Sequence, residues 1–239
     1  MSDPRERFVG GNGFRSAATR ATPADAAVRR QEMVEHQLRK RGIRDERVLA
    51  AMLSVPRHEF VPPELAAEAY SDRPLPIGLQ QTISQPFMVA AMAAALELSG
   101  SERVLEIGSG SGYQAAVLSL LAREVYTVEM LELLAADTGE RLRRLGYANV
   151  QVHVGDGTLG WPDRAPFDGI VVTAAAPDIP PPLASQLAQG GRLIIPVGSP
   201  DEQQLLRVEK QGDTITKRAL YHCRFVPLVG QYGWKPKGN

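Results

Sequence analysis

Three glycines and one acidic residue, Glu106, lie in one short segment, residues 106–113 (EIGSGSGY), at the end of the apolar run RVLEI. Glycines at a turn between a strand and a helix let a ligand approach the backbone, and free N–H groups at the helix start favour polar or anionic ligand groups. In open α/β sheets, ligands bind at the carboxyl ends of the strands, where such a turn lies. The segment therefore predicts a ligand site, with a purely structural tight turn as the alternative.

The spacing of the glycines separates three kinds of nucleotide-binding loop. A dinucleotide loop, G-x-G-x-x-G, would need its third glycine at Tyr113, whereas the third glycine here is Gly112. No Gly-Lys-Ser/Thr follows, which disfavours a phosphate-binding loop. Together with Glu106 the loop reads E-x-G-x-G-x-G, which resembles the first motif of Rossmann-like S-adenosylmethionine-dependent methyltransferases. In those enzymes the acidic residue faces the amino-acid end of the cofactor and the loop packs against it.

Two further acids follow at the ends of the next two predicted strands. Glu129 lies roughly 20 residues beyond the glycine loop, where an acid accepts hydrogen bonds from ribose hydroxyls, in dinucleotide sites as well. Asp156, in the sequence GDG, ends the following strand, where methyltransferases commonly contact the adenine amino group. Either acid alone could be a solvated turn residue. Acids or glycine clusters at three successive strand ends predict a nucleoside ligand, and the glycine spacing favours S-adenosylmethionine.

Strand-like and helical patterns alternate from residue 101 onward. They lie, in order, at residues 103–108, 114–122, 124–130, 131–145, 149–157, 167–176, 181–189 and 190–198. Because the strand-like runs are apolar on both faces, we expect a parallel sheet covered by helices. The tail alternates around a Gly-Asp turn signal, which predicts antiparallel strands at one edge. The predicted fold class is α/β, a Rossmann-like, doubly wound, mostly parallel sheet of about seven strands with helices on both faces.

The segment before this core has a different composition. Residues 1–25 are rich in Gly, Arg, Ser and Thr and predict a flexible arm. A mitochondrial presequence is the alternative, which the acids Asp3, Glu6 and Asp25 disfavour. We expect one methyltransferase domain at residues 26–239. Its parts are a helical cap and pre-motif segment at 26–100, a cofactor-binding core at 101–200 and C-terminal strands at 201–239.

Local signals inside the cap predict three helices and an irregular stretch. Residues 26–41 follow a helical pattern with Val28 on the inward stripe, and Asp45 is placed to cap a second helix. The proline-rich residues 57–81 predict an ordered, irregular segment with one short helix. Pro86 suits the first turn of the alanine-rich helix that follows.

Composition excludes several classes of protein. The chain of 239 residues has 27 basic and 27 acidic side chains, so no basic excess supports nucleic-acid binding. No apolar run reaches the roughly 18 residues needed to span a membrane, and the N-terminus lacks the apolar core of a secretory signal. The single Cys223 excludes an internal disulfide, and the four histidines lack ligand spacing, so we expect no metal. We expect a cytoplasmic monomer without nucleic-acid or membrane partners.

The loop after the fourth predicted strand indicates which kind of group accepts the methyl. Enzymes that methylate nucleobase amines often carry an Asn/Asp-Pro-Pro-aromatic loop there, whereas this chain has Thr173 followed by AAAP. No cysteine pair is present to activate a pyrimidine carbon. An oxygen that is already ionised, such as a carboxylate with an unperturbed pKa of about 4, needs no general base. The sequence therefore favours a carboxylate acceptor.

Five separated segments resemble the protein-L-isoaspartate O-methyltransferase family, whose members repair isomerised aspartyl residues. They are residues 81–88 (QTISQPFM), 104–118 (VLEIGSGSGYQAAVL), 155–177 (GDGTLGWPDRAPFDGIVVTAAAP), 190–198 (GGRLIIPVG) and 224–230 (RFVPLVG). The TISQP stretch distinguishes this family from other methyltransferases, which in general do not share it. The resemblance implies methyl transfer from S-adenosyl-L-methionine, with S-adenosyl-L-homocysteine as product. The implied acceptor is the free carboxylate of L-isoaspartyl residues in damaged proteins, repaired through a succinimide, and use of D-aspartyl residues stays open.

The resemblance also implies roles for individual residues. Ser84 is the implied active-site hydroxyl, within a stretch that lines both cofactor and substrate, and Val226, Pro227 and Leu228 are implied contacts of the substrate peptide. The implied cofactor contacts are Gln81, Thr82, Ile83, Glu106, Gly108, Ser109, Gly110, Glu129, Met130, Asp156, Gly157 and Thr173.

Ser84 has two interpretations. From local sequence alone, it caps the helix that Pro86 opens. As the active-site hydroxyl it would orient the acceptor carboxylate, because no histidine lies near it in sequence to activate it as a nucleophile. Two other functions also stay open, a catalytically silent relative and a nicotinamide oxidoreductase, which Tyr113 disfavours. Val89, where some relatives carry a polar residue, leaves the peptide preference open.

Overall fold

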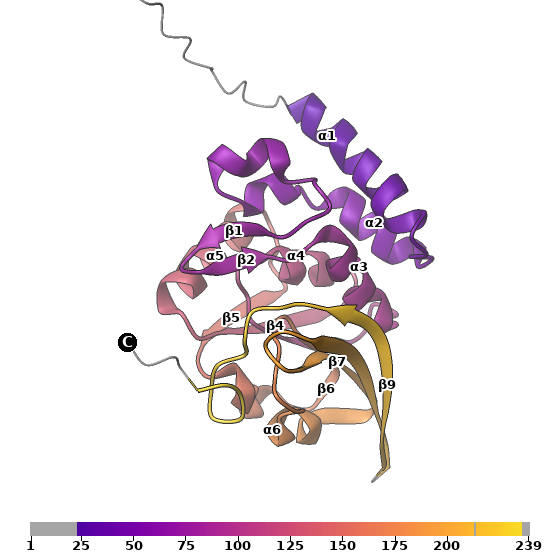
Figure 1. The fold of residues 1–239 in the computed structure, drawn as a ribbon, viewed down its shortest axis with the longest axis vertical. Helices are drawn as coiled ribbons and strands as arrows, with labels where there is room; N and C mark the ends of the chain where they lie inside the picture. Colours follow the sequence, from indigo (N-terminus) through magenta and orange to yellow (C-terminus); the bar gives the residue numbers. More distant parts are fainter. Residues whose placement is uncertain (1–22, 213, 236–239) are drawn as a thin grey trace, which may run out of the picture.

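The computed structural model describes residues 23–212 and 214–235, and within these seven strands form one sheet in the order β5-β4-β3-β6-β7-β8-β9 (Figure 1). The strands are β3 (Arg103–Ile107), β4 (Glu124–Glu129), β5 (Val150–Val154), β6 (Phe167–Val172), β7 (Leu187–Gly198), β8 (Gln203–Gln211) and β9 (Thr214–Cys223). The five from β3 to β7 run parallel, and β8 and β9 add antiparallel at one edge. The predicted fold class is confirmed.

The order of the strands creates a switch point beside β3. From β3 the chain adds β4 and β5 on one side, then returns to place β6 on the other side of β3. Connections leaving β3 and β6 therefore diverge, and a crevice opens at the carboxyl ends of these two strands. The predicted glycine loop, residues 106–113, begins at this point, because β3 ends at Ile107.

Residues of the central strands alternate between two hydrophobic clusters, one on each face of the sheet. Val104 faces a cluster that includes residues of α3 (Pro86–Ala95), α4 (Tyr113–Ser119) and α5 (Glu132–Arg144). Leu105 faces the opposite cluster, which includes Leu183 of α6 (Pro181–Ser185). Apolar side chains thus project from both faces of the parallel strands, as their sequences predict.

The boundary between α6 and β7 differs from the prediction. The helical pattern at residues 181–189 gives a helix only as far as Ser185, and β7 already begins at Leu187. Phe167 at the start of β6 pairs with Leu187, before a register shift that aligns Gly169 with Arg192. Strand pairing therefore overrides the helical pattern of the last residues, since tertiary contacts outweigh local propensity.

The first helix begins earlier than predicted. α1 spans Pro23–Glu32 and continues as a π-helix over Met33–Arg39, so the arm predicted for residues 1–25 overlaps the helix at 23–25. The rest of the arm, residues 1–22, lies outside the described residues. Val28 was wrongly placed on the inward stripe, because its side chain is 57% exposed. The wider turn of a π-helix shifts the buried face relative to the 3.6-residue period.

The cap contains a hairpin that the sequence did not predict. Its segments are α2 (Glu46–Ser54), 3₁₀ helices at Arg57–Phe60 and Pro63–Glu68, and the antiparallel strands β1 (Leu75–Gly78) and β2 (Gln81–Ile83). Asp45 caps α2 as predicted, since its Oδ1 accepts hydrogen bonds from the backbone N–H groups of Arg47 and Val48. Leu79 and Gln80 form the hairpin turn with positive φ angles of 49° and 58°. Such turns usually carry glycine or asparagine, so no sequence signal marked this one.

The cap and the sheet share a hydrophobic core. The cluster on the α4 side runs from Ala26 in α1 through Met52 in α2 to Leu205 in β8. We therefore propose that residues 26–239 form one domain. No helix in the described part of the chain is long and apolar enough to cross a membrane.

Candidate active site

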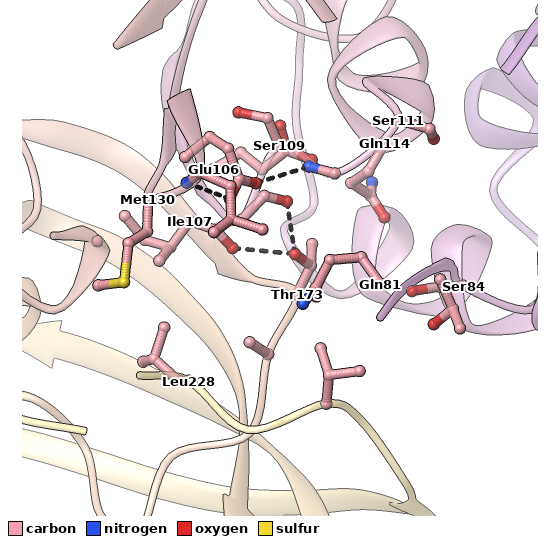
Figure 2. Close-up of a pocket in the computed structure, with 18 of the residues that line it drawn as sticks. Gln81, Ser84, Glu106, Ile107, Ser109, Ser111, Gln114, Met130, Thr173 and Leu228 are labelled. Atoms are coloured by element: carbon pink, nitrogen blue, oxygen red, sulfur yellow. Dashed lines mark hydrogen bonds between the residues drawn. The ribbon is translucent and has the colours of Figure 1, made fainter. Parts of the chain in front are cut away.

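A cavity of about 360 Å³ opens at the carboxyl ends of β3, β4 and β6 (Figure 2). Its walls come from the hairpin β1–β2, the glycine loop and the C-terminal segment after β9. The lining includes the predicted residues Gln81, Thr82, Ile83, Ser84, Glu106, Gly108, Ser109, Gly110, Glu129, Met130, Gly157, Thr173, Val226, Pro227 and Leu228. Segments as far apart in sequence as residues 81 and 228 therefore meet around one space.

The glycine loop packs too closely against its neighbours for side chains at two positions. Gly108 has a φ of +91°, and a Cβ atom there would lie 2.5 Å from Oγ1 of Thr173. That hydroxyl donates to the backbone oxygens of Gly108 (2.7 Å) and Ile107 (3.0 Å). Gly112 has a φ of +86°, and a Cβ atom there would lie 2.9 Å from Thr138. The glycines are thus needed for the turn itself, and the turn fixes the backbone that faces the cavity.

Glu129 ties the end of β4 to the glycine loop. Its Oε2 accepts a hydrogen bond from the Gly110 N–H (3.0 Å), and its Oε1 accepts one from the Leu131 N–H (3.1 Å). The side chain is buried yet lines the cavity. Each carboxylate oxygen can accept a second hydrogen bond, so a ligand diol can be bound without breaking these two.

Glu106 lies at the other side of the loop in a fully buried position. Its Oε2 accepts a hydrogen bond from Thr127 Oγ1 (2.5 Å), which lies 2.7 Å from Ser109 Oγ. Its Oε1 is buried without a hydrogen-bond partner among the described residues. Burial raises the pKa of Glu106 to about 8, and the charge of Glu129 adds to this effect. A cationic or donor group of a ligand would satisfy Oε1 and favour the ionised form.

Asp156 is the predicted cofactor residue that does not line this cavity. Its Oδ1 accepts hydrogen bonds from the backbone N–H (2.9 Å) and Oγ1 (2.7 Å) of Thr158, and its Oδ2 accepts one from the Gln231 N–H (2.7 Å). Asp156 is the N-cap of a 3₁₀ helix at Gly157–Leu159. Its carboxylate thus holds a turn and the C-terminal segment in the ligand-free protein, beside Gly157, which lines the cavity. Contact of Asp156 with the cofactor stays a prediction.

The helix-capping interpretation of Ser84 is wrong. The N-cap of α3 is Gln85, and no side chain caps the helix there among the described residues. The carbonyl oxygen of Ser84 instead accepts a hydrogen bond from Nη2 of Arg57 (2.7 Å), while Ser84 itself lines the cavity. The backbone at Ser84 is therefore fixed by a residue 27 positions earlier, and its hydroxyl is available to a ligand.

Arg57 is a fully buried cation, and the sequence analysis missed it. Its Nε donates to the carbonyl oxygen of Ala69 (2.6 Å), and its guanidinium lies 4.8 Å from the ring centre of Tyr113, the first residue of α4. Burial lowers the pKa of Arg57 to about 10. Arg57 thus connects Ser84 to the helix that follows the glycine loop, through a carbonyl hydrogen bond and an aromatic contact.

The C-terminal segment is held against the end of β6 by backbone hydrogen bonds. The Ala175 N–H donates to the Val226 oxygen (2.8 Å), and the Leu228 N–H donates to the Ala175 oxygen (2.8 Å). Trp234 Nε1 donates to the same Ala175 oxygen (3.1 Å), which supports a packing role for this tryptophan. Residues 226–228 therefore form a fixed wall of the cavity.

Comparisons with known proteins agree with this geometry. The family model for protein-L-isoaspartate(D-aspartate) O-methyltransferase matches residues 28–233. A protein-L-isoaspartate O-methyltransferase of Geobacter metallireducens is 57% identical over 208 residues, which cover 87% of this chain and 96% of that protein. The chain belongs to the protein-L-isoaspartate O-methyltransferase family.

Other members and solved structures extend the match. A protein-L-isoaspartate O-methyltransferase 2 of Pelobacter propionicus is 58% identical, covering 86% of this chain and 92% of its own. A solved protein-L-isoaspartate O-methyltransferase superposes with a TM-score of 0.77 at 30% identity, covering 85% of this chain and 67% of its own. A Plasmodium falciparum protein in complex with S-adenosyl-L-homocysteine superposes with a TM-score of 0.71 at 27% identity, covering 84% and 98%.

The cavity of this methyltransferase fits an S-adenosyl cofactor. The buried, unpartnered Oε1 of Glu106 suits a cationic donor such as the amino group at the amino-acid end. Glu129 retains acceptor capacity for ribose hydroxyls while it accepts a hydrogen bond from the Gly110 N–H.

Several residues of this site were not among the site residues predicted from the sequence. Thr127, Arg57 and Tyr113 act through buried contacts, and Gln114 and Val229 line the cavity. Gln114 was within reach of the sequence, because it directly follows the glycine loop in the resemblance segment at residues 104–118. Arg57 was not, because its partners are backbone carbonyls 12 and 27 residues away.

Proposed function

We propose that this methyltransferase transfers a methyl group from S-adenosyl-L-methionine to the free carboxylate of L-isoaspartyl residues in damaged proteins and peptides. The observation that carries the proposal is the pairing, in one cavity, of an acid–glycine end with the hydroxyl of Ser84. Membership of the family supports the same reaction. Use of D-aspartyl residues, which the name of the family model includes, belongs to this proposal as a second substrate class.

The acid–glycine end would hold the cofactor. Glu129 would accept hydrogen bonds from the ribose hydroxyls while it keeps the hydrogen bond from the Gly110 N–H. Glu106 would accept a hydrogen bond from the amino group through its unpartnered Oε1, and Met130 and Thr173 complete the walls. When bound, S-adenosyl-L-methionine supplies an electrophilic methyl group on a sulfonium sulfur. Asp156 supports this end from outside the cavity by fixing the turn that begins at Gly157.

The other end would orient the acceptor. Ser84 donates its hydroxyl hydrogen to one oxygen of the isoaspartyl carboxylate and leaves the second oxygen free to attack the methyl carbon in line. The carboxylate is already ionised at neutral pH, so the attack needs no general base. The described residues that line the cavity accordingly include carboxylates and hydroxyls but no histidine or lysine. Val226, Pro227 and Leu228 contact the flanking peptide.

Repair consists of the methyl transfer and of later steps that need no group of the enzyme. In the methyl transfer, the carboxylate oxygen would bond to the methyl carbon as the carbon–sulfur bond breaks, and the sulfur would keep the electron pair of that bond in the product S-adenosyl-L-homocysteine. The backbone nitrogen that follows the isoaspartyl residue then attacks the ester, methanol leaves, and a succinimide forms. Hydrolysis of the succinimide yields normal aspartate in part. The enzyme supplies only the methylation.

We propose further that the protein acts as a monomer in the cytoplasm. Residues of this chain already supply both the predicted cofactor contacts and Ser84 around one cavity, which is what supports this proposal. The single cysteine, Cys223, is a free thiol, as a reducing compartment maintains it. Analytical ultracentrifugation at the concentration of the activity assay tests the monomer, and a sedimenting dimer with activity that falls on dilution contradicts it.

The function is tested with a matched pair of peptides, one isoaspartyl and one aspartyl, and labelled S-adenosyl-L-methionine. The proposal predicts base-labile label on the isoaspartyl peptide alone. A third peptide with D-aspartate at the same position tests the second substrate class. Label on neither of the first two peptides, with binding of S-adenosyl-L-homocysteine intact, contradicts the proposed acceptor and leaves a cofactor-binding protein.

A further inference from the structure

Gln114 is a buried amide on the wall of the cavity. It is the second residue of α4 and lines the cavity, although only 6% of its surface is exposed. Figure 2 shows its side chain directed from the helix into the space between the glycine loop and Ser84. Its Nε2 is buried and finds no acceptor in the described part of the chain.

An unpaired amide nitrogen at a buried position destabilises the folded protein. Most buried polar groups have partners, so each exception needs an explanation. A methionine would fill nearly the same volume without a polar group and would remove this cost. Rotation of the terminal amide by half a turn presents the NH₂ group to the cavity, where a ligand oxygen can accept from it. The unpaired amide is therefore accounted for if the bound substrate is its partner.

We propose that Gln114 and Ser84 together bind the acceptor carboxylate, and this inference rests on the proposed function. Two neutral donors position the carboxylate without cancelling its charge, so the attacking oxygen stays nucleophilic. A cation in direct contact would weaken that nucleophile. The nearby cation, Arg57, is instead turned toward the carbonyl oxygens of Ala69 and Ser84 and the ring of Tyr113.

The cofactor carries a carboxylate as well, at its amino-acid end. Glu106 lines the cavity there, and two anions avoid close contact. In Figure 2, Gln114 and Ser84 lie on the side of the cavity away from Glu106 and Met130, which favours the isoaspartyl carboxylate as the partner of the amide. The two sources of carboxylate make different predictions for binding, so an experiment separates them.

The test compares Gln114→Met and Gln114→Glu with a matched control, Gln186→Met. Gln186 is equally buried, but both ends of its amide are paired, to the Trp161 N–H and the Leu159 oxygen, and it lies outside the cavity lining. For each variant we would measure KM for the isoaspartyl peptide at saturating cofactor, Kd for S-adenosyl-L-homocysteine by calorimetry, and Tm.

Gln114→Met is expected to raise KM for the peptide about tenfold or more, because a hydrogen bond to a charged group is lost. Its Tm is expected to equal or exceed that of the wild type, and Kd for S-adenosyl-L-homocysteine is expected to stay unchanged. Gln114→Glu is expected to raise KM further through repulsion of two carboxylates. Gln186→Met is expected to lower Tm and leave KM unchanged.

Two results would overturn the inference while wild-type activity stands. A weaker Kd for S-adenosyl-L-homocysteine with unchanged KM would assign the amide to the cofactor. A fall in Tm with both binding constants unchanged would assign it to the fold. A wild-type enzyme that does not methylate the isoaspartyl peptide would overturn the proposed function, and this inference with it.

Discussion

The two ends of the cavity are built in different ways. The cofactor end consists of turns at the ends of β3 and β4, where Glu106 and Glu129 lie within 23 residues of each other and belong to neighbouring strands. The acceptor end joins Arg57, Ser84 and residues 226–229, which are brought together from distant parts of the chain.

This difference has a consequence for how variants act. At the cofactor end, the sheet fixes the backbone and polar side chains complete the site. At the acceptor end, the position of Ser84 depends on a buried arginine, and residues 226–228 depend on backbone bonds to Ala175. Substitutions at the cofactor end should therefore change cofactor affinity and leave KM for the peptide unchanged. Substitutions at the acceptor end should change KM for the peptide and leave cofactor affinity unchanged.

The largest difference between the effect on peptide methylation and the effect on cofactor affinity is expected for Ser84→Ala. Loss of the orienting hydroxyl should lower kcat/KM for the isoaspartyl peptide by about 100-fold, since a small misplacement of the reacting atoms is costly. Kd for S-adenosyl-L-homocysteine should stay near that of the wild type. Ser185→Ala, which removes an exposed hydroxyl on α6, is the control. Activity of Ser84→Ala equal to that of this control would remove Ser84 from the reaction.

Glu129→Gln should have the opposite pattern, with weaker cofactor binding and unchanged KM for the peptide. Both oxygens of Glu129 accept from N–H groups, so an amide would place its own NH₂ against one of them. We expect Kd for S-adenosyl-L-homocysteine to rise about tenfold, the effect of losing a charge-assisted hydrogen bond. Peptide KM at saturating cofactor should not change. Calorimetry measures the first quantity, and an unchanged Kd would contradict the assignment of the ribose site.

Arg57→Met should act on the acceptor end and on stability. The Ala69 and Ser84 carbonyl oxygens lose their donor, which should lower the free energy of unfolding by about 1–3 kcal/mol. Peptide KM should rise several-fold, while Kd for S-adenosyl-L-homocysteine should stay unchanged. Urea denaturation and steady-state kinetics measure these effects. Arg29→Met, which removes an exposed bond to Ala67, is the control, and an equal KM in both variants would make Arg57 purely structural.

The smallest effect concerns the buried charge of Glu106 in the cofactor-free protein. The pKa rises from its usual 4.5 to about 8 on folding, so the contribution of this group to stability is full below pH 4.5 and is lost as pH rises toward 8. Glu106→Gln has no such loss, so its stability relative to the wild type should increase by about 1 kcal/mol per pH unit across this window. Denaturant unfolding at pH 6 and pH 7 measures the change. Parallel pH profiles of the two proteins would show that Glu106 is not protonated on folding.

The same contrast explains how much the sequence could predict. The glycine loop, Glu106 and Glu129 were predicted because each lies at the end of an apolar run, and parallel strands bring such ends together. The parallel strands and the antiparallel tail followed from the same patterns, whereas the order of the strands in the sheet did not. Sequence spacing reports local structure well, and the cofactor end is local.

Other features depended on contacts that spacing does not encode. The β1–β2 hairpin turns at Leu79 and Gln80, which carry no turn signal, and β7 begins at Leu187 inside a helical pattern. The bonds of the Asp156 carboxylate to Thr158 and Gln231 were likewise not predicted from its motif. Ser84 itself was identified through the resemblance, because local sequence favoured the capping interpretation.

The most direct test is a crystal structure with S-adenosyl-L-homocysteine and an isoaspartyl peptide bound together. The account predicts ribose hydroxyls hydrogen-bonded to Glu129, and the peptide carboxylate hydrogen-bonded to Ser84 Oγ and the Gln114 amide, with one carboxylate oxygen facing the cofactor sulfur. A peptide carboxylate bound away from Ser84, with the cofactor product in the same cavity, would contradict the division of the cavity into these two ends.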